Sequence, residues 1–160
     1  MAKQFKTNAL RMLDKAKIHY EIKEYEYDED HLSGHHIIDK VDLDANQIFK
    51  TLVLHDNHND YLVCCIPVLE EIDLKKLAKL AQRKNVEMIH QKDLLAVTGY
   101  IRGGCSPVGM KKRFPTYIDE RIYEVEKVAF SAGKRGYQMV VAVSDIIDYL
   151  QPVIGNVIRK

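Results

Sequence analysis

The sequence predicts a single α+β domain over residues 1–160, built on a mixed, mostly antiparallel sheet with helices packed around it. Three observations predict this class. Runs of β-forming residues come in pairs joined by turn residues, as they do in hairpins. Short helical segments with capping residues separate these pairs. The regular alternation of strand and helix that produces a doubly wound sheet is missing, as are repeats, linkers and low-complexity tracts.

The N-terminal part is expected to form helix, strand and helix. Thr7 is placed to cap a first helix that ends near Lys17. The segment His19–Tyr27 mixes Tyr and Ile with polar residues, which is typical of a half-buried strand. Ser33 is placed to cap a short second helix. The apolar residues of that helix are Ile37, Ile38 and Val41.

The middle of the chain contains the strongest hairpin signal. Ile48–His55 and Tyr61–Val68 are rich in β-forming residues, and the five residues between them are Asp, Asn and His, which favour a tight turn. Asp73 is placed to cap the next helix. The apolar stripe of this helix consists of Leu74, Leu77, Ala78 and Ala81. A short strand at 86–89 and a short helix at 91–97, ended by Gly99, follow.

A loop and a second hairpin are expected next. Residues 98–109 contain four glycines and a proline, too many for a regular element. Strands are expected at 116–119, 127–131 and 137–143, with a turn at 133–136 between the last two. Ser144 is placed to cap a final helix that Pro152 closes, and an apolar tail follows at 153–158.

The net charge does not mark a nucleic-acid-binding protein. The chain carries 24 Lys and Arg against 23 Asp and Glu, a formal charge of +1. Positive charge is instead local, in clusters at 111–113, 134–135 and 159–160. On charge alone, a solvated surface is a more common explanation of such clusters than contact with phosphates.

The composition also argues against metal, disulfide and membrane roles. The three cysteines match no zinc or disulfide spacing, and the seven histidines, which include His35 and His36, form no His-x-x-x-His pair with a third ligand. No Walker A motif or strand-anchored GxGxxG is present. Because residues 1–8 lack a signal-peptide core and no window is apolar enough to span a bilayer, we expect a cytoplasmic protein without cofactor or metal.

Lys50 is the most informative single residue. Strand alternation places it on one face with Ile48, Leu52 and Leu54, in an otherwise apolar row. An ammonium group is costly to bury without a partner. Such a lysine therefore extends to the sheet edge, pairs with an acid or serves a site. The pattern alone leaves these alternatives open, and an edge or structural role is the more frequent one.

Two glycine-containing segments are candidate binding loops. The N–H groups of Gly103–Pro107 could converge on a carbonyl oxygen or a phosphate, or the segment could be only a turn. Cys105 and Ser106 invite a nucleophile hypothesis, but no nearby His or acid is arranged to activate either. Ser131–Gly136 joins a hydroxyl to two cations held between glycines. It suits phosphate or carboxylate recognition, although a hairpin turn with exposed charges is more common.

Three motifs in this order resemble one known family. They are Phe-Lys-Thr-Leu at 49–52, the glycine-rich stretch from Gly99-Tyr100 through Gly103-Gly104-Cys105-Ser106-Pro107-Val108-Gly109, and Ser-Ala-Gly-Lys-Arg-Gly at 131–136. Together they resemble the YbaK/EbsC-type aminoacyl-tRNA deacylases, free-standing relatives of the editing domain inserted in bacterial prolyl-tRNA synthetases. The resemblance covers nearly the whole chain. It favours the functional interpretation of each motif.

The resemblance implies a fold, a reaction and partners. The fold is a mixed, barrel-like sheet with surrounding helices. The reaction is cleavage of the ester that joins an amino acid to the tRNA 3′ acceptor end, chiefly in Cys-tRNA(Pro) made in error by prolyl-tRNA synthetase. This editing takes place in trans, and we expect transient association with that synthetase.

The resemblance also implies roles for individual residues. Lys50 matches the family's essential lysine, Gly104 its glycine-loop backbone contact, Ser131 its substrate-site serine and Tyr25 a pocket tyrosine. On the residue pattern alone, Tyr25 and Tyr27 fit the core equally well. The other expected substrate contacts are Gly103, Cys105, Ser106, Pro107, Lys134, Arg135 and Gln138.

The implied chemistry needs no protein nucleophile. An ester carbonyl that develops negative charge needs donors placed beforehand, and glycine-loop N–H groups beside a cation supply them. In cysteine-specific members the substrate's own thiol attacks its carbonyl, so the protein positions the ester and stabilises charge.

Gln138 departs from the family pattern, because members often carry an acidic residue there. An amide keeps a hydrogen bond but loses a charge, which puts the substrate preference in doubt. Two alternatives stay open: a deacylase for another small aminoacyl group, such as Ala-tRNA(Pro), and a non-catalytic module that binds aminoacyl-adenosine or phosphate.

Overall fold

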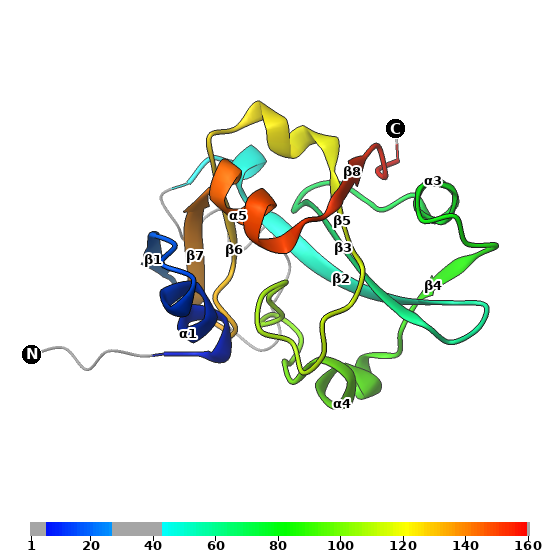
Figure 1. The fold of residues 1–160 in the computed structure, drawn as a ribbon, viewed down its shortest axis with the longest axis horizontal. Coiled ribbons are helices and arrows are strands. Elements are labelled where there is room, and N and C mark those ends of the chain that lie inside the picture. Colours follow the sequence, from blue (N-terminus) through cyan, green and yellow to red (C-terminus); the bar gives the residue numbers. More distant parts are fainter. Residues whose placement is uncertain (1–5, 27–42, 160) are drawn as a thin grey trace, which may run out of the picture.

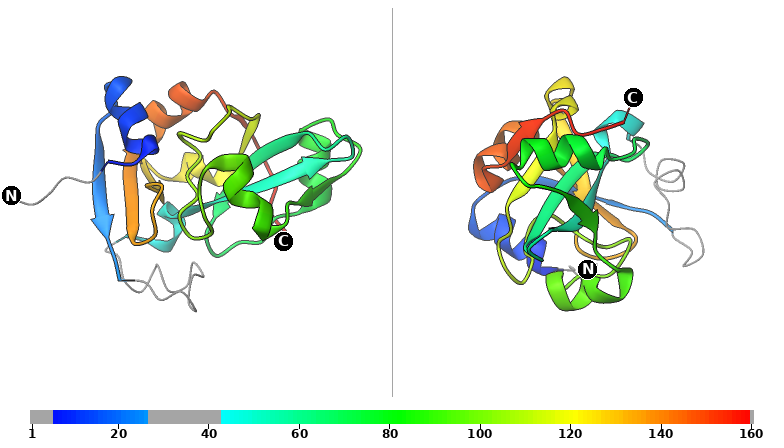
Figure 2. Two further views of the ribbon diagram at one scale, coloured as in Figure 1. Left: turned by 90° about the horizontal axis from the view of Figure 1, so that it is seen from below. Right: turned by 90° about the vertical axis from the view of Figure 1, so that its right-hand side faces the viewer.

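The chain folds into two sheets with helices packed around them (Figure 1). The computed structural model describes residues 6–26 and 43–159. The small sheet has the strand order β1-β7-β6, from Tyr20–Glu24, Tyr137–Ala142 and Lys127–Ser131. The large sheet has the order β4-β2-β3-β5-β8, from Val86–Met88, Phe49–Asp56, Tyr61–Pro67, Thr116–Asp119 and Val153–Gly155. The small sheet lies at one end of the molecule, and the long β2–β3 hairpin extends to the other (Figure 2).

The α+β class with a mostly antiparallel sheet is confirmed. Four of the six strand pairings are antiparallel, and the two parallel pairings are β3 with β5 and β5 with β8. The expected barrel-like closure is wrong. The sheets meet at one isolated parallel bridge, between Ile48 and Ala129. The same edge of β2 then pairs with β4 from Leu54 onward, so among the described residues β6 and β4 share that edge and the ladder does not close into a ring.

Among the described residues, four α-helices and three 3₁₀ turns accompany the strands. The α-helices are α1 (Asn8–Lys15), α3 (Leu74–Leu80), α4 (Leu94–Thr98) and α5 (Val143–Leu150), and the 3₁₀ turns are Ala45–Gln47, Gln91–Asp93 and Glu120–Glu124. Within the described residues, no helix combines the length and apolar character that a bilayer span requires.

Most of the expected caps are present, and one is wrong. The side chains of Thr7 and Asp73 accept from backbone N–H groups three residues on, at 3.2 and 3.0 Å. Gly99 ends α4 with a φ of 88°. Ser144 does not cap α5, because the helix begins one residue earlier. The N–H of Val143 donates to the carbonyl of Glu126 at 2.9 Å, so this helix end has a backbone acceptor in place of a hydroxyl cap.

The main core lies between the small sheet and one face of the large sheet. Phe49 of β2 and Phe130 of β6 meet there edge to face, with ring centroids 6.2 Å apart. A second apolar cluster lies beneath α3, around Leu54 and Leu77. A third, small cluster consists of Ile48, Val68, Ala129 and Val140. The expected helix capped by Ser33, and Tyr27 at the end of the first expected strand, lie outside the described residues.

Candidate functional site

Lys50 lies on the face of β2 that the alternation predicts. Ile48 on this face belongs to the small apolar cluster, whereas Leu52 and Leu54 pack in the cluster beneath α3. Phe49 on the opposite face enters the main core. The half-buried side chain of Lys50 therefore emerges between two apolar clusters. Placing an ammonium group there costs free energy, which favours a functional role for Lys50.

Burial lowers the pKa of the Lys50 ammonium, and nearby carboxylates partly oppose this. Glu71 and then Glu70 raise the pKa, and both follow the end of β3. The segment before them is fixed, because the N–H of Val68 donates to the carbonyl of Ile48 at 2.8 Å. Each carboxylate also pairs with an arginine, Glu70 with Arg121 at 3.2 Å and Glu71 with Arg159 at 3.5 Å. The two glutamates thus favour the charged form of Lys50, although Lys50 forms no direct ion pair with any described residue.

Ser131 lies on the same side of the molecule as Lys50. Ile48 and Ala129 face each other in the parallel bridge, and both pack in the same small apolar cluster. Lys50 and Ser131 each lie two residues further along their strands. Because side-chain direction repeats every second residue, both side chains emerge on that side of the two strands.

Gln138 lies beside Ser131. The two residues face each other in the antiparallel register of β6 and β7, so their side chains share a face. Gln138 is only 3% exposed, and its Oε1 has no hydrogen-bond partner. Tyr25 directly follows β1 and extends this surface: its N–H donates to the carbonyl of Gly136 at 2.8 Å, and its side chain is buried.

The two glycine-containing loops pack closely against each other. A Cβ on Gly104 would lie 3.1 Å from the backbone nitrogen of Arg135 and 3.3 Å from the Cα of Lys134. The guanidinium Nε of Arg135 donates to the carbonyl of Arg102 at 2.7 Å. Gly104 is therefore required for the close approach of two backbones. Its own N–H donates to the carbonyl of Ile101 at 2.9 Å.

The turn of the β6–β7 hairpin has a fixed conformation. Gly133 adopts a φ of 97°, and a Cβ there would lie 2.9 Å from the ring of Tyr100. The hydroxyl of Ser131 accepts from the N–H of Gly133 at 3.2 Å, which leaves its own proton available to another acceptor. The ammonium of Lys134 lies 5.6 Å from the ring centroid of Tyr137.

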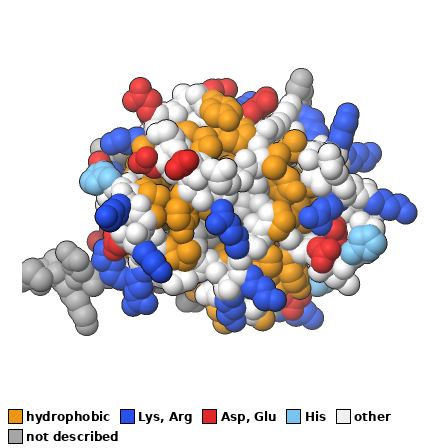
Figure 3. All heavy atoms as spheres, viewed as in Figure 1, with side chains coloured by type: hydrophobic (Ala, Val, Ile, Leu, Met, Phe, Trp, Pro, Cys, Tyr) orange, Lys and Arg blue, Asp and Glu red, His pale blue; other side chains and the backbone are white. Residues whose placement is uncertain are grey.

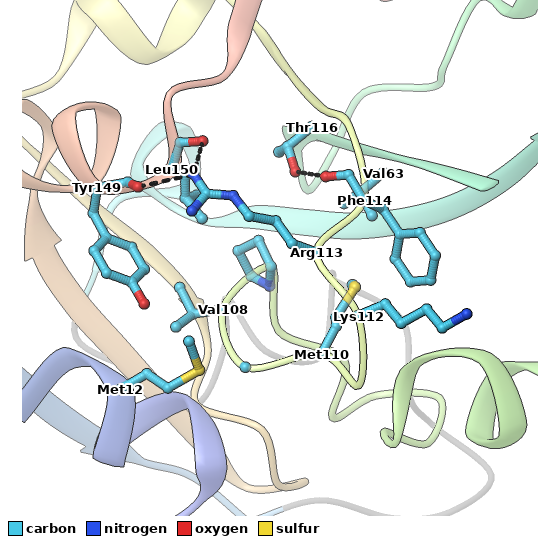
Figure 4. A pocket seen from close by; sticks show the side chains of 12 residues that line it. Met12, Val63, Val108, Met110, Lys112, Arg113, Phe114, Thr116, Tyr149 and Leu150 are labelled. Carbon is cyan, nitrogen blue, oxygen red and sulfur yellow. Dashed lines mark hydrogen bonds between the residues drawn. The ribbon is translucent and has the colours of Figure 1, made fainter. Parts of the chain in front are cut away.

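The second half of the glycine-rich loop turns away from this surface. Ser106 is fully buried, and its hydroxyl accepts from the N–H of Val108 at 3.3 Å. Burial raises the pKa of the Cys105 thiol to about 12, so this thiol stays protonated at neutral pH. Pro107 lines a cavity of about 140 Å³, shown in Figure 4, together with Met12, Phe114 and other residues. The structure thus separates Ser106 and Pro107 from the remaining candidates.

The basic clusters also differ in position. Lys134 and Arg135 lie beside Gly104 and Arg102, next to the candidate site. In the cluster at 111–113, Arg113 donates to the carbonyls of Tyr149 and Leu150 at the end of α5, as Figure 4 shows. Figure 3 shows basic and acidic side chains interspersed on one face of the molecule, with no uniform basic surface there. No group of metal-ligating side chains occurs within residues 6–26 and 43–159.

Sequence reasoning did not single out Arg102, Glu70 or Glu71 as part of this site. Arg102 had a visible signal, since it directly precedes two glycines. Glu70 and Glu71 had none, because only the pairing of β2 with β3 brings them near Lys50.

Comparison with known proteins gives one family model and several relatives. The family model described as an aminoacyl-tRNA editing domain matches residues 36–149. A protein of Enterococcus faecalis, EbsC, named as a proposed Cys-tRNA(Pro)/Cys-tRNA(Cys) deacylase, is 49% identical over 157 residues, covering 98% of this chain and 96% of that protein. A proline–tRNA ligase of Shouchella clausii is 33% identical over 99 residues, which cover 61% of this chain and 17% of the ligase.

Solved structures share the fold at low sequence identity. A protein described only as hypothetical matches with a TM-score of 0.86 and 16% identity, covering 96% of this chain and all of the other. A second structure, described as a proposed trans-editing enzyme for prolyl-tRNA synthetase, matches with a TM-score of 0.82 and 17% identity, covering 98% of this chain and all of the other. At such identities these likenesses concern the fold alone.

Proposed function

The chain belongs to the aminoacyl-tRNA editing domain family, and on that premise we propose that it is a deacylase that hydrolyses Cys-tRNA(Pro), and also Cys-tRNA(Cys), in trans. The observation that carries this proposal is that Lys50 and Ser131 emerge on one side of strands β2 and β6, while Gly104 packs against the turn that follows Ser131. The near full-length similarity to EbsC, whose name states these substrates, supports the choice of aminoacyl group.

Lys50 supplies positive charge to the ester carbonyl in the proposed mechanism. Its ammonium emerges between apolar clusters, where water screens it poorly and its attraction to a developing oxyanion is strong. Ser131 contributes a hydroxyl proton, since its oxygen already accepts from Gly133. Gly104 acts mainly by letting its loop pack closely against the backbone of Lys134 and Arg135, because its N–H already donates to the carbonyl of Ile101.

The nucleophile in this proposal is the substrate thiol. Its sulfur forms a bond to the ester carbonyl carbon, the ester C–O bond breaks, and the leaving ribose oxygen takes up a proton. Water then hydrolyses the resulting thioester to release cysteine. The protein contributes positioning and charge stabilisation. The protonated state of buried Cys105 agrees with a mechanism that uses no thiolate from the protein.

A deacylation panel tests the function. Purified protein is given Cys-tRNA(Pro), Cys-tRNA(Cys), Ala-tRNA(Pro) and Ser-tRNA esters, and release of the amino acid is followed with time. We expect the cysteine esters to react fastest, because only cysteine carries the attacking thiol. Faster release of alanine would instead assign Ala-tRNA(Pro) as the substrate. No turnover of any ester would favour a non-catalytic module that binds aminoacyl-adenosine or phosphate.

We also propose that residues 1–160 act as one editing domain in the cytoplasm and associate transiently with prolyl-tRNA synthetase. The matched segment of the Shouchella clausii ligase supports a link between this fold and that enzyme. The test is whether added synthetase increases the preference for Cys-tRNA(Pro) over Cys-tRNA(Cys). An unchanged ratio would contradict the association.

A further inference from the structure

One buried acceptor next to the proposed site has no donor. The side chain of Gln138 is 3% exposed, and its Oε1 bonds to nothing in the structure. Of the buried side-chain nitrogen and oxygen atoms that the structure describes, it is the only one without a partner. A buried carbonyl oxygen left unpaired destabilises the folded protein. Such an atom at the edge of a binding surface suggests that a ligand supplies the missing donor.

The neighbours of Gln138 do not satisfy this oxygen. Ser131 lies opposite on β6, and Lys23 lies opposite on β1. The hydroxyl oxygen of Ser131 accepts from the N–H of Gly133, and neither Ser131 nor Lys23 donates to Oε1 in the structure. The cations around the site, Lys50 and those of the β6–β7 turn, carry donors and no acceptor atoms. The carboxylates near Lys50, Glu70 and Glu71, already pair with arginines, whereas Oε1 of Gln138 has no donor.

We infer that Oε1 of Gln138 accepts a hydrogen bond from the α-ammonium group of the bound aminoacyl ester. This inference rests on the proposed function. An aminoacyl ester offers three kinds of donor, namely the α-ammonium, the free ribose hydroxyl and the cysteine thiol. The thiol is a weak donor. Of the other two, the ammonium carries the charge, so it is the group that most needs an acceptor when it leaves water.

This contact orients the ester. The α-carbon joins the ammonium directly to the ester carbonyl, so an ammonium held at Gln138 places the carbonyl toward the adjacent Ser131 hydroxyl. A neutral amide accepts from the protonated and the neutral amine alike, whereas a carboxylate favours the protonated form. Gln138 is therefore a positioning residue whose replacement by an acid introduces a pH dependence.

Paired substrates and variants test the inference. Deacylation of Cys-tRNA(Pro) and N-acetyl-Cys-tRNA(Pro) is measured with the wild type, Gln138→Met and Gln138→Glu. Methionine keeps the length of the side chain and removes the hydrogen bond. We expect Gln138→Met to lower kcat/KM for the free amine by roughly tenfold, the scale of one lost hydrogen bond, and to leave the acetylated substrate nearly unchanged. Gln138→Glu should retain turnover of the free amine and lose it as pH rises past the substrate amine pKa.

Several outcomes would overturn the inference. Equal losses on both substrates would mean that Gln138 acts elsewhere or only in folding. If the effect of Gln138→Met on kcat/KM disappears when the terminal adenosine is 2′-deoxy, and persists when the amine is acetylated, the donor is the ribose hydroxyl. If Gln138→Met raises the melting temperature and leaves the kinetics unchanged, Oε1 of Gln138 is only an unpaired atom of the core and does not contact the substrate.

A binding measurement separates this inference from the proposed function. The probes are 3′-cysteinylamino-adenosine, an amide that resists hydrolysis, and its mercaptopropionyl analogue, which lacks the amine. We expect the wild type to bind the amine-bearing probe about tenfold more tightly and Gln138→Met to bind both alike. This preference can be present even if no ester is hydrolysed. If the wild type binds the two probes equally but still deacylates Cys-tRNA(Pro), the ammonium contact is refuted and the proposed function is not.

Discussion

The two ends of strand β2 hold charges in opposite circumstances. At the hairpin end, Asp56 accepts from the N–H groups of His58 and Asp60 at 2.8 and 2.9 Å and pairs with Arg83. At the other end, Lys50 lies between apolar clusters with no ion pair among the described residues. Both pKa values are lowered, but with opposite meanings. The folded protein favours the charged form of Asp56 and disfavours the charged form of Lys50.

This contrast separates a structural charge from a candidate functional one. Every partner that Asp56 needs is supplied by the protein itself, so its charge stabilises the hairpin. By contrast, burial disfavours the charge of Lys50, and Oε1 of Gln138 has no donor, so both groups gain favourable interactions when a ligand binds.

Removing the amine of Lys50 should have the largest effect. We expect Lys50→Ala to lower kcat/KM for Cys-tRNA(Pro) by a factor of ~10²–10³, because a preorganised charge beside the developing oxyanion is lost. Lys50→Met should lose as much activity and melt no lower than the wild type, since a half-buried charge is replaced by an apolar chain. Single-turnover deacylation and thermal melts measure both. The exposed Lys79 of α3 provides the control Lys79→Ala, and undiminished turnover in Lys50→Ala would refute the assignment.

Adding one methyl group at Gly104 should loosen the site without unfolding the protein. Its Cβ would press on the backbone of Lys134 and Arg135, so the β6–β7 turn must move by a few tenths of an ångström. We expect Gly104→Ala to reduce kcat/KM by about tenfold while the melting temperature falls only slightly. Unchanged kinetics would show that the spacing of the two loops is irrelevant to the reaction.

Removing the carboxylate at the hairpin end should affect stability and spare activity. Asp56 has a folded pKa of about 2, below its usual value of 3.8. Its stabilisation is therefore complete above about pH 4 and is lost as pH falls toward 2. We expect Asp56→Asn to lower the melting temperature by several degrees at neutral pH and to weaken this acid dependence. A loss of kcat at temperatures where the variant is folded would contradict the structural role.

The smallest effect is expected at Cys105. Its thiol is buried, and its pKa is raised to about 12, so it supplies no thiolate at neutral pH. We expect Cys105→Ala to keep deacylation within about twofold of the wild type, since the substrate thiol is the proposed nucleophile. Loss of turnover in Cys105→Ala, together with inactivation of the wild type by pretreatment with a thiol-alkylating reagent, would instead point to a direct role.

Much of the fold follows from local chemistry that the sequence displays. The strands at 116–119 and 127–131 and the caps at Thr7 and Asp73 were predictable, because turn residues and caps act within a few positions. The barrel-like closure was not, because it depends on which distant strand occupies the second edge of β2. The predicted cap at Ser144 is wrong for a similar reason. The carbonyl of Glu126, which is distant in sequence, accepts from the N–H of Val143 at the start of the helix.

The candidate site was predictable in part. Lys50 stood out because it interrupts an apolar row, and strand alternation is a local rule. The close approach of Gly104 to Arg135 and the unpaired oxygen of Gln138 arise from tertiary packing, so no spacing in the sequence reveals them. The roles of these residues stay predictions until the variants are measured.

The attachment of α1 to the β6–β7 turn affects how the protein can be shortened. Thr7 donates its hydroxyl proton to the carbonyl of Ala132, and a Cβ on Gly133 would lie within 3.3 Å of the Thr7 side chain. Asn8 donates to the carbonyl of Gly109 at 2.7 Å, so the same helix end also holds the glycine-rich loop. A fragment trimmed to the matched residues 36–149 would lack this brace, together with β1 and Tyr25. Minimal versions of the domain should therefore begin no later than Lys6.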